Sequence, residues 1–421
     1  MSSCGQIKRY ILNTPLFTVR NLLLLVLVGS VVVFTFYARI NVSSELAYIN
    51  VPFYLALVLL AFRFHGKVGV LNAVLWAVGT CMFLFAEIFA GVGWKDILKF
   101  FFLYCAPLLA CQLSFGRGGA KGFARTIIRI FNAGVLSVFF ILVLDLVSGS
   151  AVMGFLTSKF MPEMTSWISA GLFERHASIW GHYLITAGFY LVFLFVNVAY
   201  AKVEGEYLID VRILYVVATL GVLSTGGKTA LVIYLVSIVW INLTSRHGVR
   251  NAAALTAFLL ALYYLGAFDI VLERFGADDL SSGRNDSTRA MFSAELPRLI
   301  GGCGERFSAH TASLIGTDYA SMFAEYSLLA LCYKFGIVYV GLACILLLWP
   351  AFSIARATGN WTIAFMGVMT LVYFSTFNGL VTMPDTYLLM ALFGICCNSL
   401  NQRSSLPKQE EGISSESGDR R

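Results

Sequence analysis

Long apolar runs recur along this chain and constrain its fold more than any other feature. Residues 21–38, 68–90 and 131–154 each contain at most one charged side chain. Across the whole chain, 58% of the 421 residues are hydrophobic and only 13% are charged. A soluble domain does not need that much apolar surface, so lipid must replace water along most of the chain. The sequence therefore predicts a polytopic membrane protein.

The continuity of these runs distinguishes helices from the strands of a membrane barrel. Barrel strands would alternate between apolar and polar side chains, whereas each spanning helix satisfies its own backbone hydrogen bonds within the hydrocarbon. We predict an all-α membrane protein with about twelve transmembrane helices. The expected spans cover residues 21–38, 48–62, 68–90, 99–115, 131–154, 179–200, 213–226, 229–245, 251–271, 336–355, 361–381 and 386–400.

Basic residues concentrate on one side of the predicted membrane. An even number of spans places both termini on the same side, together with the connection that carries Arg117, Lys121, Arg125 and Arg129. The opposite short connections carry fewer basic residues, so both termini are expected in the cytoplasm. This asymmetry accounts for the formal net charge of +7, which gives no reason to expect nucleic acid as a partner.

The spans divide the chain into five kinds of segment. These are a cytoplasmic N-terminus, helices 1–9, a long outer loop, helices 10–12 and a disordered cytoplasmic tail, over residues 1–20, 21–271, 272–335, 336–400 and 401–421. No small-residue cleavage site follows the first apolar run, which predicts an uncleaved signal-anchor. Within the long loop, residues 319–333 are apolar. They predict a helix that dips into the outer leaflet or lies along it, in preference to a thirteenth crossing.

The stretch LSSGRNDSTRAMF (residues 280–292) places Arg284, Asp286 and Arg289 close to a predicted membrane exit. The long loop carries five arginines and a single lysine near its end. This bias favours planar, bidentate recognition of phosphate or carboxylate, although a loop that balances its own salt bridges is the alternative. Gly283, with a cap from Asn285 or Asp286, predicts a helix start, which is a favourable place for a phosphate.

Further cations and acids lie near the same face. The other outer loop carries Arg175 and His176 directly before a span. The segment LSTGGKTAL lacks the glycine spacing of a phosphate-binding P-loop, and it leaves Lys228 as a cation at the outer mouth. Within the spans, Glu87 and Asp145 are acids that could balance these cations around a cavity.

Two more patterns bear on chemistry. The segment PRLIGGCGERF has one proline and three glycines, which predicts either a turn that lets the backbone approach a ligand or a plain loop. The nine cysteines are scattered without a Cys/His cluster, so no structural metal is expected.

Several of these segments together resemble the bacterial O-antigen polymerase and ligase superfamily. The resemblance spans roughly residues 165–355 and rests on STGGKTAL, LERFGADDLSSGRNDSTRAMF, PRLIGGCG and AEYSLLALCYKFGIVYVGL. It implies an inner-membrane enzyme that transfers a glycan from undecaprenyl diphosphate at the periplasmic face. Arg175 and Arg284 occupy positions that match the family's diphosphate-binding arginines, and Lys228 stands where many members have arginine. Ligases carry a His-Asn pair where this chain has Glu325 and Tyr326, which favours a polymerase or a ligase-like enzyme whose base is a carboxylate.

The resemblance and the residues together predict a mechanism without metal or cofactor. Arg175, Lys228, Arg284 and Arg289 are expected to hold the diphosphate, since arginines can neutralise the leaving group as its bond breaks. Glu325 is expected to accept the proton of the attacking hydroxyl, with Asp286 or Glu295 as the substitute base. In-line attack would invert the anomeric configuration. The expected partners are the lipid-linked oligosaccharide and membrane lipid, and the resemblance alone implies a co-polymerase that sets chain length.

Three other functions stay open. An O-antigen ligase would transfer the glycan to a lipid A core. A lipid-linked sugar transporter would show internal repeats and helices broken near the midplane, and no repeat is evident in the sequence. A membrane acyltransferase would need a His-Asp arrangement in a membrane-facing pocket, and the sequence pattern shows none.

Overall fold

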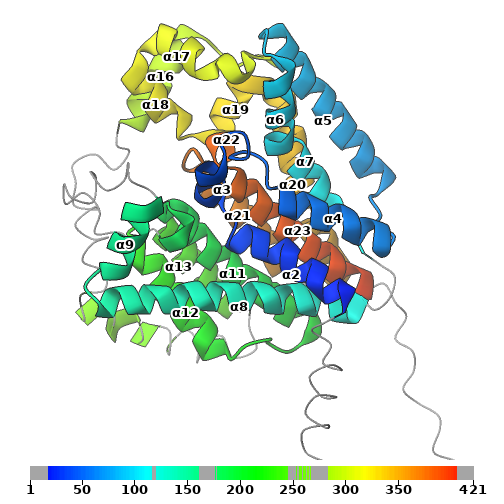
Figure 1. Ribbon diagram of the computed structural model, residues 1–421, viewed down its shortest axis with the longest axis vertical. Helices are drawn as coiled ribbons and strands as arrows, with labels where there is room; N and C mark the ends of the chain where they lie inside the picture. The colour runs from blue at the N-terminus through cyan, green and yellow to red at the C-terminus, as the bar shows by residue number, and fades with distance from the viewer. Residues whose placement is uncertain are drawn as a thin grey trace, which may run out of the picture.

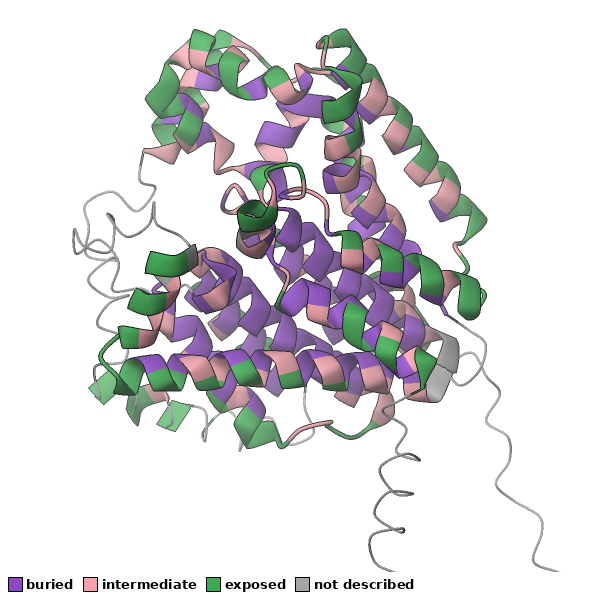
Figure 2. Cartoon of the chain, in the orientation of Figure 1, coloured by how far each residue is buried: buried purple, intermediate pink, exposed green. Residues whose placement is uncertain are grey.

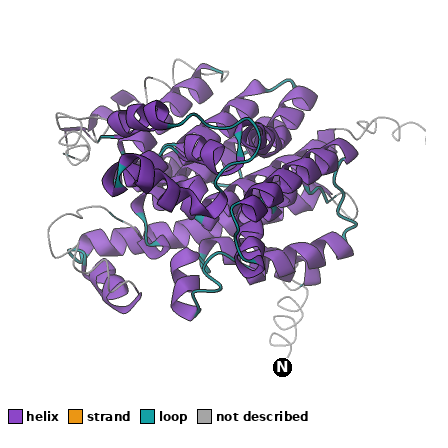
Figure 3. Cartoon of the chain, turned by 90° about the horizontal axis from the view of Figure 1, so that it is seen from above, coloured by secondary structure: helices purple, strands orange, loops and turns teal. Residues whose placement is uncertain are grey.

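The computed structural model describes residues 18–115, 120–160, 176, 178–244 and 283–404, together with scattered positions between 253 and 266. Within these residues the chain is helical and has no strand, apart from one isolated antiparallel bridge between Lys67 and Ser114. Figure 3 shows the helices packed around one another. The predicted all-α class is confirmed. The predictions for residues 1–17, Arg175, most of the span at 251–271 and the tail beyond 404 fall outside the described residues.

The helices follow the apolar runs, with several runs divided in two. The first part of the chain forms α2 (Val19–Val32), α3 (Phe36–Val42), α4 (Val51–Arg63), α5 (Val70–Phe89), α6 (Trp94–Tyr104), α7 (Ala106–Gln112), α8 (Ala120–Val147), α9 (Ala151–Phe160), η2 (Ser178–Trp180), α11 (Tyr183–Glu204), α12 (Val211–Ser224) and α13 (Lys228–Leu243). The second part forms α16 (Arg284–Ala294), η3 (Gly304–Arg306), α17 (Phe307–Ile315), α18 (Thr317–Ala324), α19 (Ser327–Phe335), α20 (Ile337–Thr358), α21 (Trp361–Ser375), α22 (Gly379–Thr382) and α23 (Pro384–Ser404).

Capping residues explain where many of these helices begin and end. Asn50, Asp210 and Asn360 each accept a hydrogen bond from a backbone N–H in the first turn of α4, α12 and α21. Gly205 and Gly359 adopt left-handed backbone conformations directly after α11 and α20, with φ of 82° and 71°. Glycine ends a helix in this way because it lacks a Cβ.

Four helices are long and apolar enough to cross a membrane. They lie at Val70–Phe89, Gly122–Val147, Tyr183–Glu204 and Ile337–Thr358. Five shorter apolar helices accompany them among the described residues. The membrane character of the chain is therefore supported, while the count of twelve spans and the orientation of the termini stay predictions.

Helix α11 lies at the centre of the bundle. Of its most apolar stretch, 89% is buried by protein, against 28% for α5 at the periphery. Figure 2 shows the buried residues concentrated in the middle of the helix bundle. A helix that is apolar on all sides can be surrounded by protein, as α11 is, or by lipid. Its one deep amide, Asn197, pairs with Asn132 of α8 through side-chain hydrogen bonds of 2.7 and 2.8 Å, as buried polar groups in a membrane bundle must.

A buried ion pair links helix α3, early in the chain, to helix α23, late in the chain. Arg39 of α3 contacts Asp385 of α23 at 2.7 Å, and both side chains are almost inaccessible to solvent. Arg39 also donates to the backbone oxygens of Phe34 and Ala47, and Asp385 accepts from the backbone N–H of Phe36. The charges are thus paired and hydrogen-bonded, which is the condition for burying them.

Helices α16 to α19 (residues 283–335) form a separate group that we call the upper subdomain, because it lies at the top of Figure 1. Its glycine-rich segment packs on its own chain. The backbone N–H of Cys303 donates to the oxygen of Tyr333, and that of Ile337 donates to Arg298, each at 3.0 Å. A Cβ on Gly302 would lie 2.2 Å from the Tyr333 oxygen. The glycines here allow backbone to meet backbone, and the approach of this turn to a ligand stays a prediction.

A buried charge cluster joins the upper subdomain to α5 and α6. Lys334 of α19 forms an ion pair with Glu305 and donates to the Tyr104 hydroxyl of α6 at 2.7 Å. The backbone N–H of Glu305 donates to Glu87 of α5 at 3.2 Å. Glu87 is fully buried, so it is not an acid that reaches out to the membrane surface. The cluster therefore holds the upper subdomain against α5 and α6.

Residues 319–333 do not form one continuous helix. They are divided between α18 and α19, with a turn at Glu325 and Tyr326. Helices of eight or nine residues measure about 13 Å, less than half the thickness of the hydrocarbon core, so neither crosses it alone. The first residue of α19, Ser327, is buried and hydrogen-bonds to the backbone oxygen of Phe377. The turn therefore holds Glu325 and Tyr326 at a partly exposed corner.

Candidate functional site

The first part of the candidate site is the start of helix α16. Gly283 has φ of 78°, and the helix begins at Arg284, so the predicted sharp turn is confirmed. The predicted cap from Asn285 or Asp286 is wrong, because both residues lie inside the first turn and the cap position belongs to Gly283. An α-helix turns by about 100° per residue. Positions i, i+3, i+4 and i+7 therefore share one face.

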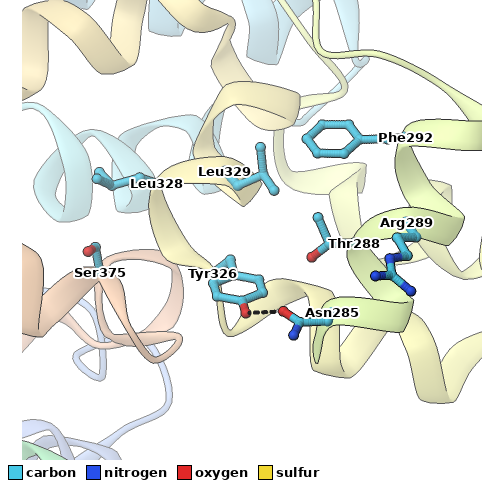
Figure 4. Close-up of a pocket in the computed structure, with 8 residues that line it drawn as sticks. All are labelled: Asn285, Thr288, Arg289, Phe292, Tyr326, Leu328, Leu329 and Ser375. Atoms are coloured by element: carbon cyan, nitrogen blue, oxygen red, sulfur yellow. Dashed lines mark hydrogen bonds between the residues drawn. The ribbon is translucent and has the colours of Figure 1, made fainter. Parts of the chain in front are cut away.

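That face of α16 borders an open cavity. Asn285, Thr288, Arg289 and Phe292 follow the i, i+3, i+4, i+7 spacing and line one wall. The opposite face buries Ser287 and Met291 against the other helices of the upper subdomain. The cavity has a volume of about 600 Å³, and its lining, drawn in Figure 4, comprises Asn285, Thr288, Arg289, Phe292, Tyr326, Leu328, Leu329 and Ser375.

Two predicted site residues meet beside this cavity. Arg284 and Glu325 form an ion pair between the Nη2 and Oε2 atoms. Their side chains are 27% and 37% exposed, so water and solutes reach the pair. The next residue on each side continues the contact, because the Tyr326 hydroxyl donates to the Asn285 side-chain oxygen at 3.1 Å. The Nε atom of Arg284 is buried and has no hydrogen-bond partner among the described residues.

Asp286 and Arg289 are the other two predicted residues of α16. They contact each other at 3.8 Å, and their side chains are 68% and 85% exposed. An exposed pair one turn apart contributes little to stability. Arg289 is therefore available to a ligand at the cavity wall, whereas Asp286 does not line the cavity.

Glu295, the second substitute base, is engaged elsewhere. Its carboxylate contacts the Nε2 atom of His310 at 2.6 Å and Arg298 at 3.7 Å. The Tyr333 hydroxyl donates to its backbone oxygen. Burial raises the pKa of the nearby Cys303 thiol to about 11. A thiol with that pKa is a poor nucleophile at neutral pH, so this corner offers no activated cysteine.

Lys228 belongs to a different part of the molecule. It is the first residue of α13, which lies in the lower part of Figure 1, whereas α16 lies at the top. The turn before it contacts His176, whose backbone N–H donates to the oxygen of Ser224 at 3.0 Å. Arg175, the residue before His176, is outside the described residues. Of the three predicted diphosphate ligands that the structure describes, Arg284 and Arg289 thus lie at the cavity and Lys228 does not.

The contact between Asp145 and His176 is one that our reading of the sequence missed. The Nδ1 atom of His176 lies 3.3 Å from the Asp145 carboxylate, and both side chains are about 5% exposed. Burial lowers the pKa of His176, with the nearby carboxylate acting in the opposite direction. Both residues stood out in the sequence, but nothing in their spacing indicated that α8 and the segment before α11 bring them together. A His-Asp arrangement is therefore present, contrary to the expectation from sequence.

Among the described residues, no three His, Cys, Asp or Glu side chains are grouped so that they could hold a metal ion. The cavity instead offers one arginine in its wall, a second arginine beside it and several hydroxyl and amide groups. This arrangement suits an anion with polar substituents.

Comparisons with known proteins identify no relative, since no family model and no curated protein matches this chain. Its function must therefore be inferred from the residues and the geometry of the site.

Proposed function

We propose that this chain is a polysaccharide polymerase that joins undecaprenyl-diphosphate-linked oligosaccharide repeat units. One observation supports this proposal above the others. Arg284 and Glu325, which the sequence pointed to separately for anion binding and for proton transfer, form an ion pair at the edge of an open cavity. A guanidinium and a carboxylate in contact are the two groups that such a transfer needs.

In the proposed reaction, a hydroxyl of the acceptor glycan attacks C1 of the diphosphate-linked sugar. A new C–O bond forms as the C1–O bond to phosphate breaks, and the diphosphate leaves with the bonding electrons. Arg284 and Arg289 stabilise the charge that develops on the leaving group, and Glu325 takes the proton of the attacking hydroxyl. A single displacement inverts the configuration at C1. Arg175 and Lys228 stay proposed as further ligands of the diphosphate.

The ion pair suggests how binding and proton transfer are coupled. In the free protein the Glu325 carboxylate occupies the guanidinium that a diphosphate would use. A diphosphate carries more charge and offers more acceptor oxygens than one carboxylate, so it competes for Arg284. Displacing Glu325 releases its carboxylate from Arg284, so that it can contact the acceptor hydroxyl. The base would thus become active only when the donor is bound.

The location of the site agrees with a substrate held in a membrane. Exposed apolar side chains follow α16, including Leu296, Leu299 and Ile300, which are 67%, 64% and 54% exposed. Side chains of this kind favour contact with lipid at a membrane surface. We propose that the site faces the periplasm of a bacterial inner membrane, with both termini in the cytoplasm. A separate co-polymerase would set the chain length.

The direct test is a polymerisation assay in lipid vesicles. The purified full chain is incubated with an undecaprenyl-diphosphate-linked repeat unit, and the products are separated on a gel. We expect a ladder of multiples. Arg284→Ala should slow its formation by about 30- to 1,000-fold, because one oxyanion donor contributes about 2–4 kcal/mol to the transition state.

Arg298→Ala is the matched control for this test. Arg298 belongs to the same subdomain, is 69% exposed and does not line the cavity. It should leave the ladder unchanged. A folded Arg284→Ala variant with full activity would contradict the assigned role. Movement of intact lipid-linked units between leaflets, without a ladder, would indicate a transporter. Transfer to a lipid A core, with no ladder, would indicate a ligase.

A membrane acyltransferase is the second candidate, because the structure places His176 against Asp145. A histidine held by a carboxylate can act as a general base for acyl transfer. This function requires an acyl donor, whereas the proposed polymerase does not. Asp145→Asn should abolish acyl transfer and leave the ladder intact if the two functions are separate. A ladder formed without any acyl donor would favour the polymerase.

A further inference from the structure

The cavity lies within one residue of both members of the ion pair. Asn285 follows Arg284, and Tyr326 follows Glu325, and both of these neighbours line the cavity. Successive Cα atoms are about 3.8 Å apart. In a lipid-linked donor the first sugar is bonded directly to the diphosphate. A diphosphate on Arg284 therefore has its first sugar within reach of the cavity.

Three hydroxyl groups in the cavity lining can accept hydrogen bonds from a ligand. The Thr288 hydroxyl donates to the backbone oxygen of Arg284 at 2.9 Å, and the Ser375 hydroxyl donates to that of Val372 at 2.7 Å. The Tyr326 hydroxyl already donates its proton to the Asn285 side-chain oxygen. The three hydroxyl oxygens of Thr288, Ser375 and Tyr326 therefore present lone pairs to a ligand. They match a ligand that supplies hydroxyl donors.

Apolar side chains lie between these hydroxyl groups. Phe292 lies one turn beyond Thr288 on the same wall, and Leu329 and the aromatic ring of Tyr326 face that wall from the other side (Figure 4). A sugar ring combines the same two kinds of group, with hydroxyls around its edge and C–H groups on its faces. A polyprenyl chain has no hydroxyl to donate to the oxygens of Thr288, Ser375 and Tyr326, and it would exclude water from them, which costs free energy. The volume of about 600 Å³ lies within the usual range for a small-molecule site.

We infer that this cavity is a sugar subsite, which holds the hexose ring attached to the diphosphate of the donor. The inference rests on the proposed function, because it takes the anion on Arg284 to be that diphosphate. Thr288, Ser375 and Tyr326 accept hydrogen bonds from the sugar hydroxyls. Phe292 and Leu329 contact its apolar face. These side chains then determine which first sugar the enzyme accepts.

Calorimetry with two probes tests the inference on the full chain in lipid nanodiscs. One probe is a short-chain polyprenyl diphosphate, and the other is the same molecule with one hexose attached. Thr288→Val and Tyr326→Phe each remove one acceptor at a partly exposed position, so folding should be preserved. Each should weaken binding of the sugar-bearing probe by about 2- to 10-fold. Neither should change binding of the sugar-free probe. Ser293→Ala is the control, since Ser293 belongs to the same helix outside the cavity.

The other outcomes overturn the inference in different ways. Equal weakening for both probes would mean that the cavity holds the polyprenyl chain. No weakening for either probe would mean that the cavity holds no part of the donor. If Arg284→Ala leaves both affinities unchanged, or if the wild-type chain binds neither probe, the proposed diphosphate site fails and the sugar subsite fails with it. If only the cavity variants lack an effect, the diphosphate site stands and the sugar subsite is wrong.

Discussion

Glu325→Gln should strengthen binding of the diphosphate and yet nearly stop the reaction. The substitution removes a negative charge from beside Arg284 while keeping the size of the side chain. The two side chains are 27% and 37% exposed, so the pair resembles a surface salt bridge in strength. Such pairs contribute about 0.2–1 kcal/mol. The diphosphate no longer has to displace that contact, so its Kd should fall by about 1.4- to 5-fold.

The effect on turnover should have the opposite sign. An amide cannot accept the proton of the attacking hydroxyl, and loss of a general base lowers the rate by about 100- to 10,000-fold. Tighter binding with slower turnover is the signature of a residue that competes with substrate and then acts on it. If Glu325 had only a structural role, replacing it with glutamine would not combine tighter diphosphate binding with slower turnover.

The assay measures Kd for a short-chain polyprenyl diphosphate by calorimetry and kcat from the polymer ladder. Asp318→Asn is the matched control, because Asp318 is an exposed acid on the neighbouring helix α18. The gain in affinity should shrink as salt is added, since salt screens a partly exposed pair. Weaker diphosphate binding in Glu325→Gln would refute the competition. If Glu295→Gln lost the turnover instead, Glu295 would be the base.

Three further predictions concern the framework. Asp385→Asn should lower the unfolding free energy by about 3–5 kcal/mol, since Arg39 would keep a buried charge without a counter-ion; thermal unfolding in detergent checks this, and an unchanged Tm would contradict it. Gly302→Ala should cost about 1–3 kcal/mol because its Cβ would lie 2.2 Å from a backbone oxygen of α19, whereas Gly93→Ala, with open space around it, should be tolerated in the same assay. In a variant that keeps Cys303 as its only cysteine, about 1 thiol in 1,000 should be ionised at pH 8, because burial raises the pKa of Cys303 to about 11. The rate of maleimide labelling should therefore keep rising as the pH approaches 11. A rate that levels off near pH 9 would contradict this pKa.

The sequence predicted the class of fold well but the division of its helices poorly. Apolar runs identify chain that avoids water, and they look the same whether lipid or protein surrounds them. The run at 21–38 therefore gave no sign that it divides into α2 and α3. The central position of α11 was also hidden, since α5 is as continuous in its apolar character yet mostly exposed.

The candidate site could be predicted by residue type but not by contact. Arg284 stood out because it opens a polar stretch next to an apolar run, and Gly283 correctly indicated a helix start. The meeting of Arg284 with Glu325 depends on the turn between α18 and α19, which no local pattern showed. The contact between Asp145 and His176 was missed for the same reason. Their contact depends on how α8 packs, and packing is set by the whole bundle.

Burial separates the ion pairs that hold this protein together from the one assigned to its function. The side chains of Arg39 and Asp385 are 0% and 1% exposed, and Lys334 within its cluster is 3% exposed. Opening either pair would leave a charge in a low-dielectric interior, at a cost of several kcal/mol, so neither can exchange its partner for a ligand. Arg284 contacts Glu325 at a partly exposed corner, where exchange costs about 1 kcal/mol or less. Among these pairs it alone combines a cation with an accessible cavity. An anionic substrate can therefore replace the carboxylate there without unfolding any part of the bundle.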